Sequence, residues 1–569
     1  MKYTGARIVI ECLIEQGVDT VFGYPGGAIL NIYDELYKNK NRLRHILTAH
    51  EQGASHAADG YARSSGKVGV VMATSGPGAT NLVTGIATAY MDSVPIVAIT
   101  CNVITPLLGK DSFQEIDITG VTMPITKHNF IVRDVGKLAD TIREAFFIAK
   151  TGRPGPVLID IPKDVTAASC DYEPAQSPFD TRFAKRKASL HRIMTVCDIP
   201  DEKIDKLASL INASERPFIY AGGGVIISDA CEELKALAEK AQIPVSTSLM
   251  GKSAFPNTHA LSTGMIGMHG TKASNTAVDR CDLLLAIGTR FSDRVIGDPK
   301  RFAGRAKIVQ IDIDPAEVNK NIAVVDSLVG SIKDALSRLV PLVEKRKASE
   351  WNAKIDEWKT EVPRSRKRTG KLSPKSIFEY VNGSVPPDTI ITTEVGQHQM
   401  WTALFYHFEK PRTFLTSGGL GTMGFGTGAA IGAQFANPDK TVVHFAGDGS
   451  FRMNCNELAT ISHYGLPIII VVFNNGALGN VRQWQTLFYE KRYSATTLDF
   501  APDFVKLADA YDISGVRVTS EAEFKKAFDA ALASGKPAVI DAAIDKDEMV
   551  LPMIPPGKSV DRIMMDIDL

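Results

Sequence analysis

Two short polar motifs, separated by one helical stretch, could together bind a metal ion and a phosphate. Gly447-Asp448-Gly449 directly follows the apolar run 442–446, and Asn474-Asn475 directly follows the β-rich run 467–473. The two runs are expected to be neighbouring parallel strands whose carboxyl ends meet at one edge of a sheet. A carboxylate and a carboxamide are oxygen ligands suited to Mg²⁺, and the glycines allow close approach of a phosphate. The pair predicts a magnesium–diphosphate site, whereas Gly-Asp-Gly alone is typical of an ordinary turn.

A second stretch of the chain repeats this pattern without the acidic residue. Residues 70–100 contain paired valines, a turn at Gly76-Pro77-Gly78, a helical segment and a second β-branched run. Such self-similarity predicts two related strand–helix–strand modules. Because Pro77 stands where the other module has Asp448, the first module is expected to hold another part of the ligand whose diphosphate lies on the second.

Two other segments resemble catalytic motifs but lack an essential residue. The segment 50–56, which contains Glu51, resembles a zinc-protease helix, but the motif needs a histidine where this chain has Ala54. Considered alone, Glu51 is expected to stabilise a helix N-terminus through the helix dipole. Gly251-Lys252-Ser253 resembles the end of a phosphate-binding loop, but Ser246 replaces the leading glycine, which disfavours ATP.

Composition limits the kinds of partner. A chain of 569 residues is too long for one hydrophobic core and should form about three domains. Lysine plus arginine and aspartate plus glutamate both number 64, so no net field attracts nucleic acid or an anionic membrane. Small neutral or anionic metabolites are the expected partners.

Cysteine usage and the N-terminus predict a cytoplasmic protein. The seven cysteines are scattered and never occur as Cys-x-x-Cys, which favours reduced thiols over a disulfide framework. The N-terminal residues lead directly into a helical pattern without a signal or transit segment. No apolar run approaches the roughly 18 residues of a membrane span.

The predicted organisation is three domains joined by two linkers. In the middle of the chain, strands that end at Gly222-Gly223-Gly224, Gly288 and Asp312 are typical of a nucleotide-binding sheet. The linkers are polar, with basic runs at 185–187 and 364–368 that lack the interleaved aromatic residues of a nucleic-acid site. The predicted boundaries are 1–170 for the first domain, 171–200 for a linker, 201–342 for the central domain, 343–372 for a linker and 373–569 for the third domain.

The spacing of Gly-Asp-Gly and Asn-Asn resembles the fingerprint of thiamine-diphosphate enzymes. Segments 103–117, 151–157, 160–165, 249–251, 267–270 and 288–294 further resemble the acetohydroxyacid synthase family, also called acetolactate synthases, and the similarity covers nearly the whole chain. This resemblance implies an α/β fold of three domains. Two related thiamine-diphosphate-binding domains with parallel sheets would flank a central FAD-binding domain.

The resemblance also assigns cofactor roles. It implies that Mg²⁺ is bound by the side chains of Asp448 and Asn475 and by the carbonyl of Ala477, and that Glu51 hydrogen-bonds the pyrimidine ring and promotes proton transfer. The other residues implied for thiamine diphosphate are Gly26, Gly27, Pro77, Gln397, His398, Gly421, Met423, Gly447 and Gly449. Those implied for FAD are Arg153, Gly222, Gly223, Gly224, Arg290 and Asp312. Considered alone, Met423 would be a core residue.

Substrate residues follow from the same resemblance. Phe113, Gln114 and Lys163 are implied to face the substrate channel, and Asp293 with Arg294 to lie where a guanidinium can hold a 2-oxoacid carboxylate. The remaining substrate residues implied are Met268, Asn480 and Trp484. Isolated residues of these types are more often solvated groups or surface ion pairs.

The implied reaction is the decarboxylation of pyruvate and transfer of its two-carbon unit to a second 2-oxoacid, giving 2-acetolactate or 2-aceto-2-hydroxybutyrate. A homodimer or homotetramer and a small regulatory subunit are implied as well, with the tail 551–557 near the site. The sequence departs from the family at Asn480, usually methionine, at Ile104, usually proline, and at Thr427-Gly428, usually Leu-Pro. Asn480 leaves open a carboligase with an aldehyde acceptor or a diketone-cleaving hydrolase. An inactive homologue is disfavoured because Glu51, Asp448 and Asn475 are all present.

Overall fold

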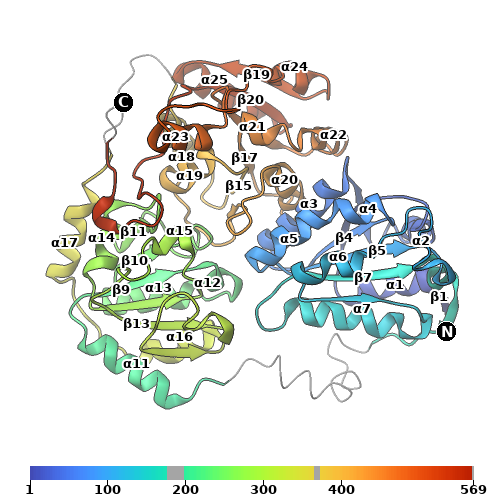
Figure 1. Ribbon diagram of the computed structural model, residues 1–569, viewed down its shortest axis with the longest axis horizontal. Helices are drawn as coiled ribbons and strands as arrows, with labels where there is room; N and C mark the ends of the chain where they lie inside the picture. Colours follow the sequence, from blue (N-terminus) through green and yellow to red (C-terminus); the bar gives the residue numbers. More distant parts are fainter. Residues whose placement is uncertain (176–197, 364–371, 567–569) are drawn as a thin grey trace.

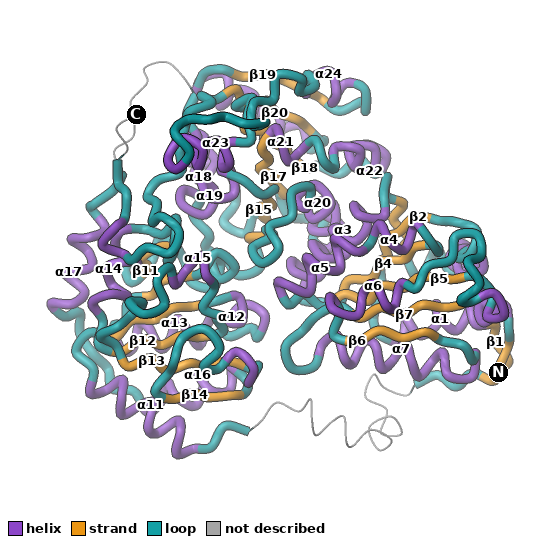
Figure 2. Tube along the Cα trace, viewed as in Figure 1, coloured by secondary structure: helices purple, strands orange, loops and turns teal. Residues whose placement is uncertain are grey.

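The computed structural model describes residues 1–175, 198–363 and 372–566, and it contains three α/β domains (Figure 1). Each domain is built around a six-stranded sheet in which neighbouring strands are parallel. Strands and helices alternate along the chain, and the helices pack against the faces of the sheets (Figure 2). The predicted three-domain α/β architecture is therefore confirmed. The basic runs 185–187 and 364–368 lie outside the described residues.

The sheet of the first domain has the order β3-β2-β4-β5-β7-β6, and a small antiparallel pair, β1 with β8, lies beside it. Its buried strands are rich in valine and isoleucine, as expected for a parallel sheet covered on both faces. The strands are β1 (Lys2–Thr4), β2 (Thr20–Tyr24), β3 (Arg44–Leu47), β4 (Gly69–Ala73), β5 (Ile96–Asn102), β6 (His128–Ile131), β7 (Val157–Pro162) and β8 (Ser169–Asp171). The helices are α1 (Gly5–Glu15), α2 (Leu30–Lys38), α3 (Glu51–Ser65), α4 (Pro77–Asn81), α5 (Val83–Asp92), α6 (Ile118–Thr122), α7 (Val135–Lys150) and α8 (Lys163–Ala167).

The sheet of the third domain has the order β16-β15-β17-β18-β20-β19. When strands are counted in order of appearance, this is the strand order of the first domain, so the repeated modules belong to two domains of one topology. The strands are β15 (Ile390–Thr393), β16 (Phe414–Leu415), β17 (Val442–Gly447), β18 (Ile468–Asn474), β19 (Ser514–Val518) and β20 (Ala538–Ala543). The helices are α18 (Pro374–Ser384), α19 (Gln397–Phe405), α20 (Phe425–Ala436), α21 (Asp448–Phe451), α22 (Leu458–His463), α23 (Gly479–Phe488), α24 (Phe504–Asp509) and α25 (Glu521–Ser534).

A buried Asn–Asp pair occurs at the same place in both related sheets. In the first domain Asn102 ends β5 and donates to the Asp160 carboxylate on β7 at 2.7 Å. In the third domain Asn474 ends β18 and donates to Asp541 on β20 at 2.9 Å. In each case the aspartate lies two residues before the register partner of the asparagine. This shared contact supports the relationship between the domains.

The central sheet has the order β11-β10-β9-β12-β13-β14. Counted in order of appearance this is 3-2-1-4-5-6, the strand order of dinucleotide-binding sheets, in which ligands bind where the order reverses. The strands are β9 (Pro217–Ala221), β10 (Val245–Thr247), β11 (Ser262–Met265), β12 (Leu283–Ile287), β13 (Lys307–Asp312) and β14 (Asp326–Val329). The helices are α11 (Asp201–Ala213), α12 (Gly223–Ile227), α13 (Cys231–Ala241), α14 (Lys272–Arg280), α15 (Asp293–Ile296), α16 (Ile332–Leu342) and α17 (Glu350–Lys359).

Part of the predicted linker 343–372 belongs to the central domain. Helix α17 buries Trp351 and Ile355 in the core of that domain, and Trp358 packs edge-on against Trp351. The Trp351 indole N–H donates to the carbonyl of Pro217 at 3.1 Å. These three residues recur at helical spacing, and charged residues on the other face made the segment resemble a linker.

Helices α3 and α20 join the first domain to the third, and Figure 1 shows them side by side. A Cβ atom on Gly60 would lie 2.2 Å from the carbonyl oxygen of Ala429, and one on Gly432 would lie 1.8 Å from that of Ala57. Gly428, one of the departures from the family pattern, would contact Gly53 in the same way at 2.8 Å. Glycine therefore allows the two helix backbones to touch.

The part of the chain that the structure describes has no helix long and apolar enough to cross a membrane. Six of the seven cysteines fall within it, all as free thiols, and Cys197 lies outside it. Burial raises the pKa of the Cys12 thiol to about 12, so this thiol is protonated and unreactive at neutral pH.

Candidate active site

The predicted metal-binding residues leave adjacent strands at one sheet edge. Gly447 on β17 is the register partner of Phe473 on β18, so Asp448 and Asn475 emerge side by side. Asp448 is 2% exposed, and its Oδ1 accepts a hydrogen bond from the Gly449 N–H at 2.9 Å. Asn475 Oδ1 accepts one from the Ala477 N–H at 3.1 Å.

The second carboxylate oxygen of Asp448 fits a metal ion. Asp448 Oδ2 is buried without a hydrogen-bond partner, and burial raises the pKa of this carboxyl to about 7 although backbone N–H groups lower it. A bound cation would satisfy the oxygen and stabilise the ionised form. The described residues contain no group of three or more His, Cys, Asp or Glu side chains able to hold a metal. A site with one carboxylate suits Mg²⁺, which takes other ligands from phosphate and water.

The turn before α19 borders this edge. Gln397 uses both amide donors, because its Nε2 donates to Gln483 Oε1 at 3.1 Å and to the Glu548 carbonyl at 2.8 Å. Its Oε1 accepts from Asn475 Nδ2 at 3.2 Å, so Gln397 orients the predicted metal ligand. His398 is buried with an unpartnered Nε2, and burial lowers its pKa to about 3, which leaves a neutral ring beside Gly447.

A glycine-rich turn after β16, residues 417–424, carries Gly421 and Met423, two of the residues predicted for thiamine diphosphate. Gly421 is exposed with a φ of +71°, and Met423 is half-buried rather than a core residue. The turn ends against Glu394, a fully buried carboxylate that accepts hydrogen bonds from the N–H groups of Gly424 and Gly426 at 2.6 and 3.0 Å. Burial raises the pKa of Glu394 to about 7. Glu394 was not predicted from the sequence, although an acidic residue directly after the apolar strand 390–393 was a usable signal.

Glu51 is the first residue of α3 and is 8% exposed. Its Oε2 accepts a hydrogen bond from Asn81 Nδ2 at 2.9 Å, which fixes the carboxylate against α4. The helix N-terminus has its own cap, because His50 Nδ1 accepts from the Gln52 N–H at 3.1 Å. Glu457 of the third domain accepts from the His50 N–H at 3.0 Å and holds the segment before α3. Glu51 is thus buried and oriented without being the capping side chain.

The other predicted residues of the first domain lie at the carboxyl edge of its sheet. Phe113 is 88% exposed, and Gln114 is exposed with a φ of +58°. Lys163 is half-buried at the start of α8, and Pro77 is exposed at the start of α4. The remaining two are Gly26, whose Cα packs against Thr74, and Gly27, which is open.

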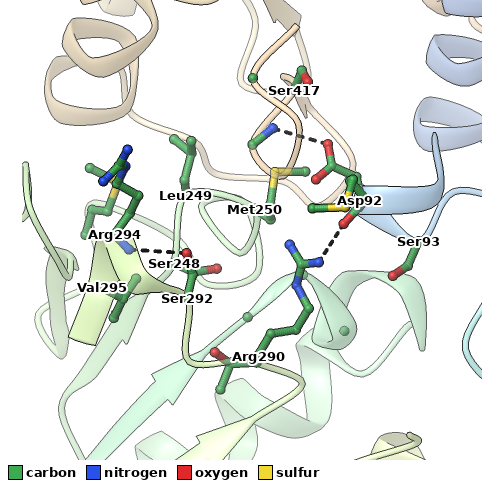
Figure 3. Close-up of a pocket in the computed structure, with 18 of the residues that line it drawn as sticks. Asp92, Ser93, Ser248, Leu249, Met250, Arg290, Ser292, Arg294, Val295 and Ser417 are labelled. Atoms are coloured by element: carbon green, nitrogen blue, oxygen red, sulfur yellow. Dashed lines mark hydrogen bonds between the residues drawn. The ribbon is translucent and has the colours of Figure 1, made fainter. Parts of the chain in front are cut away.

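A cavity of about 1170 Å³ lies between the three domains (Figure 3). It brings together most of the residues predicted for FAD and substrate. Those that line it are Arg153, Gly222, Gly223, Gly224, Met268, Arg290, Arg294, Asp312, Asn480 and Trp484. Gly421, predicted for thiamine diphosphate, lines it as well. Its lining includes neither Asp448 nor the predicted residues Glu51, Phe113, Gln114 and Lys163. Asp293 also lies outside the lining, with its exposed carboxylate 3.4 Å from Arg294.

The central-domain wall of this cavity lies where the strand order reverses. Gly222 follows β9 and Gly288 follows β12, and a Cβ atom on Gly222 would lie 2.1 Å from the Gly288 carbonyl oxygen. Asp312 ends β13, and burial raises its pKa to about 6. A crevice between such strands, with an acid at a neighbouring strand end, is the usual place for a dinucleotide.

Two predicted flavin residues also connect the central domain to the first. Arg153 Nε donates to Ser93 Oγ at 2.8 Å, and its Nη1 is 2.7 Å from Glu317 Oε1. Arg290 Nη1 donates to the Met91 carbonyl at 2.7 Å. Both side chains are therefore held in defined positions at the cavity wall.

The side of the cavity that carries the predicted substrate residues combines a cation with an aromatic ring. The Arg294 guanidinium lies 6.0 Å from the centre of the Trp484 ring. Asn480 lies four residues before Trp484 on α23 and so shares its helix face. The tail reaches the same place, because the Ile554 N–H donates to the Met268 carbonyl at 2.8 Å. An arginine beside an aromatic wall can bind a small organic carboxylate.

Three protein-family models of thiamine pyrophosphate (TPP) enzymes match the chain. They are the N-terminal TPP binding domain over residues 3–121, the central domain over 204–339 and the C-terminal TPP binding domain over 394–542. A probable acetolactate synthase large subunit of Methanocaldococcus jannaschii is 50% identical over 99% of this chain and 95% of its own length. The acetolactate synthase large subunits of Parasynechococcus marenigrum and Corynebacterium glutamicum are 47% and 46% identical, over 98% and 100% of this chain and 90% and 91% of theirs. Identity of this extent includes all three domains, and the chain therefore belongs to the thiamine pyrophosphate enzymes, among the acetolactate synthase large subunits.

Proposed function

We propose that the protein is a transferase that decarboxylates pyruvate and joins the remaining two-carbon unit to a second 2-oxoacid, giving 2-acetolactate or 2-aceto-2-hydroxybutyrate for branched-chain amino-acid biosynthesis. The three relatives, which match it over 90% to 95% of their own length, are named acetolactate synthase large subunits, one of them as probable. The single structural observation that carries the proposal is the cavity whose lining brings Arg294 of the central domain together with Trp484 and Gly421 of the third domain. A 2-oxoacid has a carboxylate for the guanidinium and a short apolar chain for the indole.

The third domain supplies the binding site for the cofactor. Thiamine diphosphate, when bound, would supply a thiazolium ring able to delocalise the electron pair that stays behind when CO₂ leaves. Asp448, Asn475 and the Ala477 carbonyl would hold Mg²⁺ on the diphosphate, and Gln397 keeps Asn475 in place. The first domain supplies Glu51, whose carboxylate would hydrogen-bond the pyrimidine and hold a proton at Oε1 or Oε2 during its activation.

The acceptor would be oriented by cavity residues. Arg294 would bind the carboxylate of the second 2-oxoacid and Trp484 would contact its alkyl group. Phe113, Gln114 and Lys163 would narrow the channel from the first domain. The exposure of Phe113 supports this role, since its ring is free to contact a bound molecule or another subunit.

FAD is the second proposed cofactor. The 3-2-1-4-5-6 strand order, the crevice at Gly222 and Gly288, and the buried Asp312 support a dinucleotide in the central part of the cavity. A yellow purified protein whose released chromophore is FAD is the expected result. A colourless protein that takes up no FAD would contradict this part of the proposal.

We also propose that two copies of the chain complete the site. Glu51 and Phe113 do not line the cavity that contains Gly421 and Trp484, which supports a pairing of the first domain of one subunit with the third domain of another. A homodimer or homotetramer follows. The relatives are named large subunits, which supports a small regulatory subunit as a partner. A cytoplasmic location stays a prediction.

Product analysis tests the reaction. Purified protein with thiamine diphosphate, Mg²⁺ and FAD is given pyruvate alone, pyruvate with 2-oxobutyrate, or pyruvate with an aldehyde, and the products are separated by chromatography. Acetolactate from the first mixture and 2-aceto-2-hydroxybutyrate from the second are expected. Consumption of pyruvate without either product would contradict the proposal.

Asn480 supports keeping a second candidate function, a carboligase with an aldehyde acceptor or a diketone-cleaving hydrolase. Asn480 lines the cavity, where an amide could hydrogen-bond a substrate or a water molecule. The variant Asn480→Met should shift the ratio of the products in the mixed-acceptor reaction towards the two 2-oxoacid products. Unchanged ratios would show that Asn480 does not set the outcome.

A further inference from the structure

We propose that Asp92 is a positioning residue that fixes the turn 417–424, and through it the contacts that Gly421 and Met423 make with thiamine diphosphate. The inference rests on the proposed function, since it concerns the site for that cofactor. Asp92 belongs to the first domain and the turn to the third, so the contact acts across a domain boundary. We refer to the turn 417–424 as the cofactor turn.

The Asp92 carboxylate holds the beginning of the cofactor turn. Asp92 ends α5 and is 8% exposed. Its Oδ1 accepts a hydrogen bond from the Gly419 N–H at 2.7 Å, and its Oδ2 accepts one from the Gly418 N–H at 3.2 Å. Figure 3 shows the carboxylate directed at the backbone of the turn beside Ser417. Charge-assisted bonds of this kind, away from water, fix backbone position more strongly than neutral ones.

Close packing makes this contact specific. A Cβ atom on Gly419 would lie 2.7 Å from Asp92 Oδ1 and 2.8 Å from the Met91 carbonyl oxygen. Only glycine leaves room for the turn to reach the carboxylate. Glu394 holds the other end of the turn through the Gly424 N–H at 2.6 Å. Gly421 and Met423 thus lie on a segment anchored at both ends by buried carboxylates.

The neighbours of Asp92 connect this anchor to the cavity wall. The Met91 carbonyl accepts from Arg290, and the Ser93 hydroxyl accepts from Arg153. Three consecutive residues, 91–93, therefore contact both the cofactor turn and the two arginines proposed for FAD. Within this group, Asp92 is the residue whose side chain holds the cofactor turn, and it would therefore act on thiamine diphosphate indirectly, through Gly421 and Met423.

A merely structural role is the alternative, because Asp92 also belongs to a buried ion-pair network. Arg63 Nη2 lies 3.0 Å from Asp92 Oδ2 and 3.2 Å from Asp59 Oδ2. Arg63 Nη1 also donates to the Thr416 carbonyl at 2.9 Å. Asp59 is fully buried and pairs with the same arginine, but the N–H groups of the turn donate to Asp92. Asp59 therefore offers a matched control that weakens the ion pair and leaves the anchor intact.

The variant Asp92→Asn removes the anchor with little change in shape. Both oxygens of Asp92 accept hydrogen bonds from donors, so an amide in either orientation places its NH₂ group against an N–H. Thiamine diphosphate binding to the full-length protein is measured by isothermal titration calorimetry at saturating Mg²⁺ without pyruvate, and Tm is measured by scanning calorimetry. We expect Kd to rise roughly 10- to 100-fold, the value of one or two hydrogen bonds to a charged group.

The control Asp59→Asn should lower Tm at least as much and change Kd less than about threefold, since Arg63 keeps Asp92 and the Thr416 carbonyl as partners. Gly419→Ala retains both carboxylates, displaces the turn and should reproduce the loss of affinity. If Asp92→Asn does not fold, the affinity of Gly419→Ala for thiamine diphosphate tests the inference in its place. Equal affinity of the Gly419→Ala and wild-type proteins, or an equal loss in Asp59→Asn, would overturn the inference. Wild-type protein that binds no thiamine diphosphate would overturn the proposed function as well.

Discussion

The first and third domains have the same strand order, but the carboxyl edges of their sheets differ in burial and polarity. In the third domain this edge carries buried polar groups, and Asp448 is 2% exposed. In the first domain the corresponding edge carries open glycine and proline turns and Phe113, which is 88% exposed. One topology can thus carry an enclosed polar site or an open apolar rim, and the turn residues decide between them.

The difference suggests a division of work between the two domains. The third-domain edge is a network in which Gln397 orients Asn475 and Glu394 anchors the cofactor turn, so it is preformed for a charged ligand. The first-domain edge carries a buried carboxylate, Glu51, which Asn81 orients, and beside it exposed side chains such as Phe113. We therefore expect the third domain to bind the cofactor and the first to activate it. The following predictions test this comparison.

The largest effect on turnover is expected from Glu51→Gln. The amide keeps the size of the side chain but cannot exchange a proton, so kcat should fall by about 10²- to 10⁴-fold, the usual contribution of an acid–base group. Binding of thiamine diphosphate and Mg²⁺, measured by calorimetry, should remain close to that of the wild type. Glu457→Gln alters another buried carboxylate beside the same helix and should lower Tm more than turnover. Undiminished turnover of Glu51→Gln would remove Glu51 from the mechanism.

Asp448→Asn should have the complementary phenotype, a failure to bind. The variant removes the carboxylate of the proposed metal site, so the affinity for Mg²⁺ with thiamine diphosphate should fall by more than about 100-fold, the upper end of what outer-shell changes cost. The rise in Tm that the two ligands give the wild type should disappear. Removal of metal from the wild type with EDTA should have the same result, and added Mg²⁺ should reverse it. Retained ligand-dependent stabilisation in Asp448→Asn would contradict the metal site.

Local patterns in the sequence were sufficient to predict much of the molecule. The Gly-Asp-Gly and Asn-Asn motifs lie on consecutive strands, and strand order then forces them together, so the pairing of Asp448 with Asn475 follows from the sequence alone. The repeat at 70–100 predicted the duplicated module for the same reason. The three-domain α/β fold followed from alternating strand and helix patterns and from the resemblance to a known family.

Contacts between distant segments could not be predicted in this way. Asp92 accepts hydrogen bonds from Gly418 and Gly419, which lie 326 and 327 residues away in the sequence. The periodic spacing of residues within a helix or strand does not predict a pairing over such a separation. Helix α17 was assigned to a linker because its charges mask three apolar positions at helical spacing. Met423 was expected in the core when considered alone, but the turn that carries it bends towards the cavity and leaves it half-buried.

The open edge of the first domain predicts how the protein assembles. Burying a phenylalanine is worth about 1.5 to 3 kcal/mol, so Phe113→Ser should weaken self-association by roughly 10- to 100-fold if Phe113 packs against another subunit. Analytical ultracentrifugation across a dilution series would measure this. Tyr37→Ser is the matched control, because Tyr37 is also exposed but lies near the end of α2, which runs back towards the amino edge of the sheet. Equal dissociation of both variants, or of neither, would place the interface elsewhere.

The smallest predicted effect concerns the Asn–Asp pair that the two sheets share. Asp160 accepts from both Asn102 and Thr100, whereas Asn474 donates to Asp541 Oδ1 and leaves the buried Oδ2 without a hydrogen-bond partner. Asn474→Ala leaves Asp541 without a side-chain donor and should reduce the free energy of unfolding of the apo protein by about 1 to 3 kcal/mol. Asn102→Ala leaves Asp160 its Thr100 donor but also removes the bonds of Asn102 to the Ile116 carbonyl and the Val103 N–H, so only the pH-dependent part of its cost should be smaller. Denaturant unfolding of both variants would measure the difference.

The pH dependence of that difference gives the sharper test. Burial raises the pKa of Asp160 and Asp541, and their asparagine donors lower it. Because each folded pKa lies above the unfolded value, these groups contribute stability at low pH that is lost as pH rises through the folded pKa. Removing a donor raises the folded pKa further, so the cost of Asn474→Ala should grow as pH rises through the folded pKa. Below about pH 4 only the part of the cost that does not depend on charge should remain, because the carboxyl is then protonated in the folded state of both proteins. Asp541→Asn in the same background should abolish the dependence on pH, since no ionised carboxylate then needs the donor. A pH-dependent cost that is equal in the two domains, or a cost that does not change with pH, would mean that the shared pair is held by packing rather than by charge.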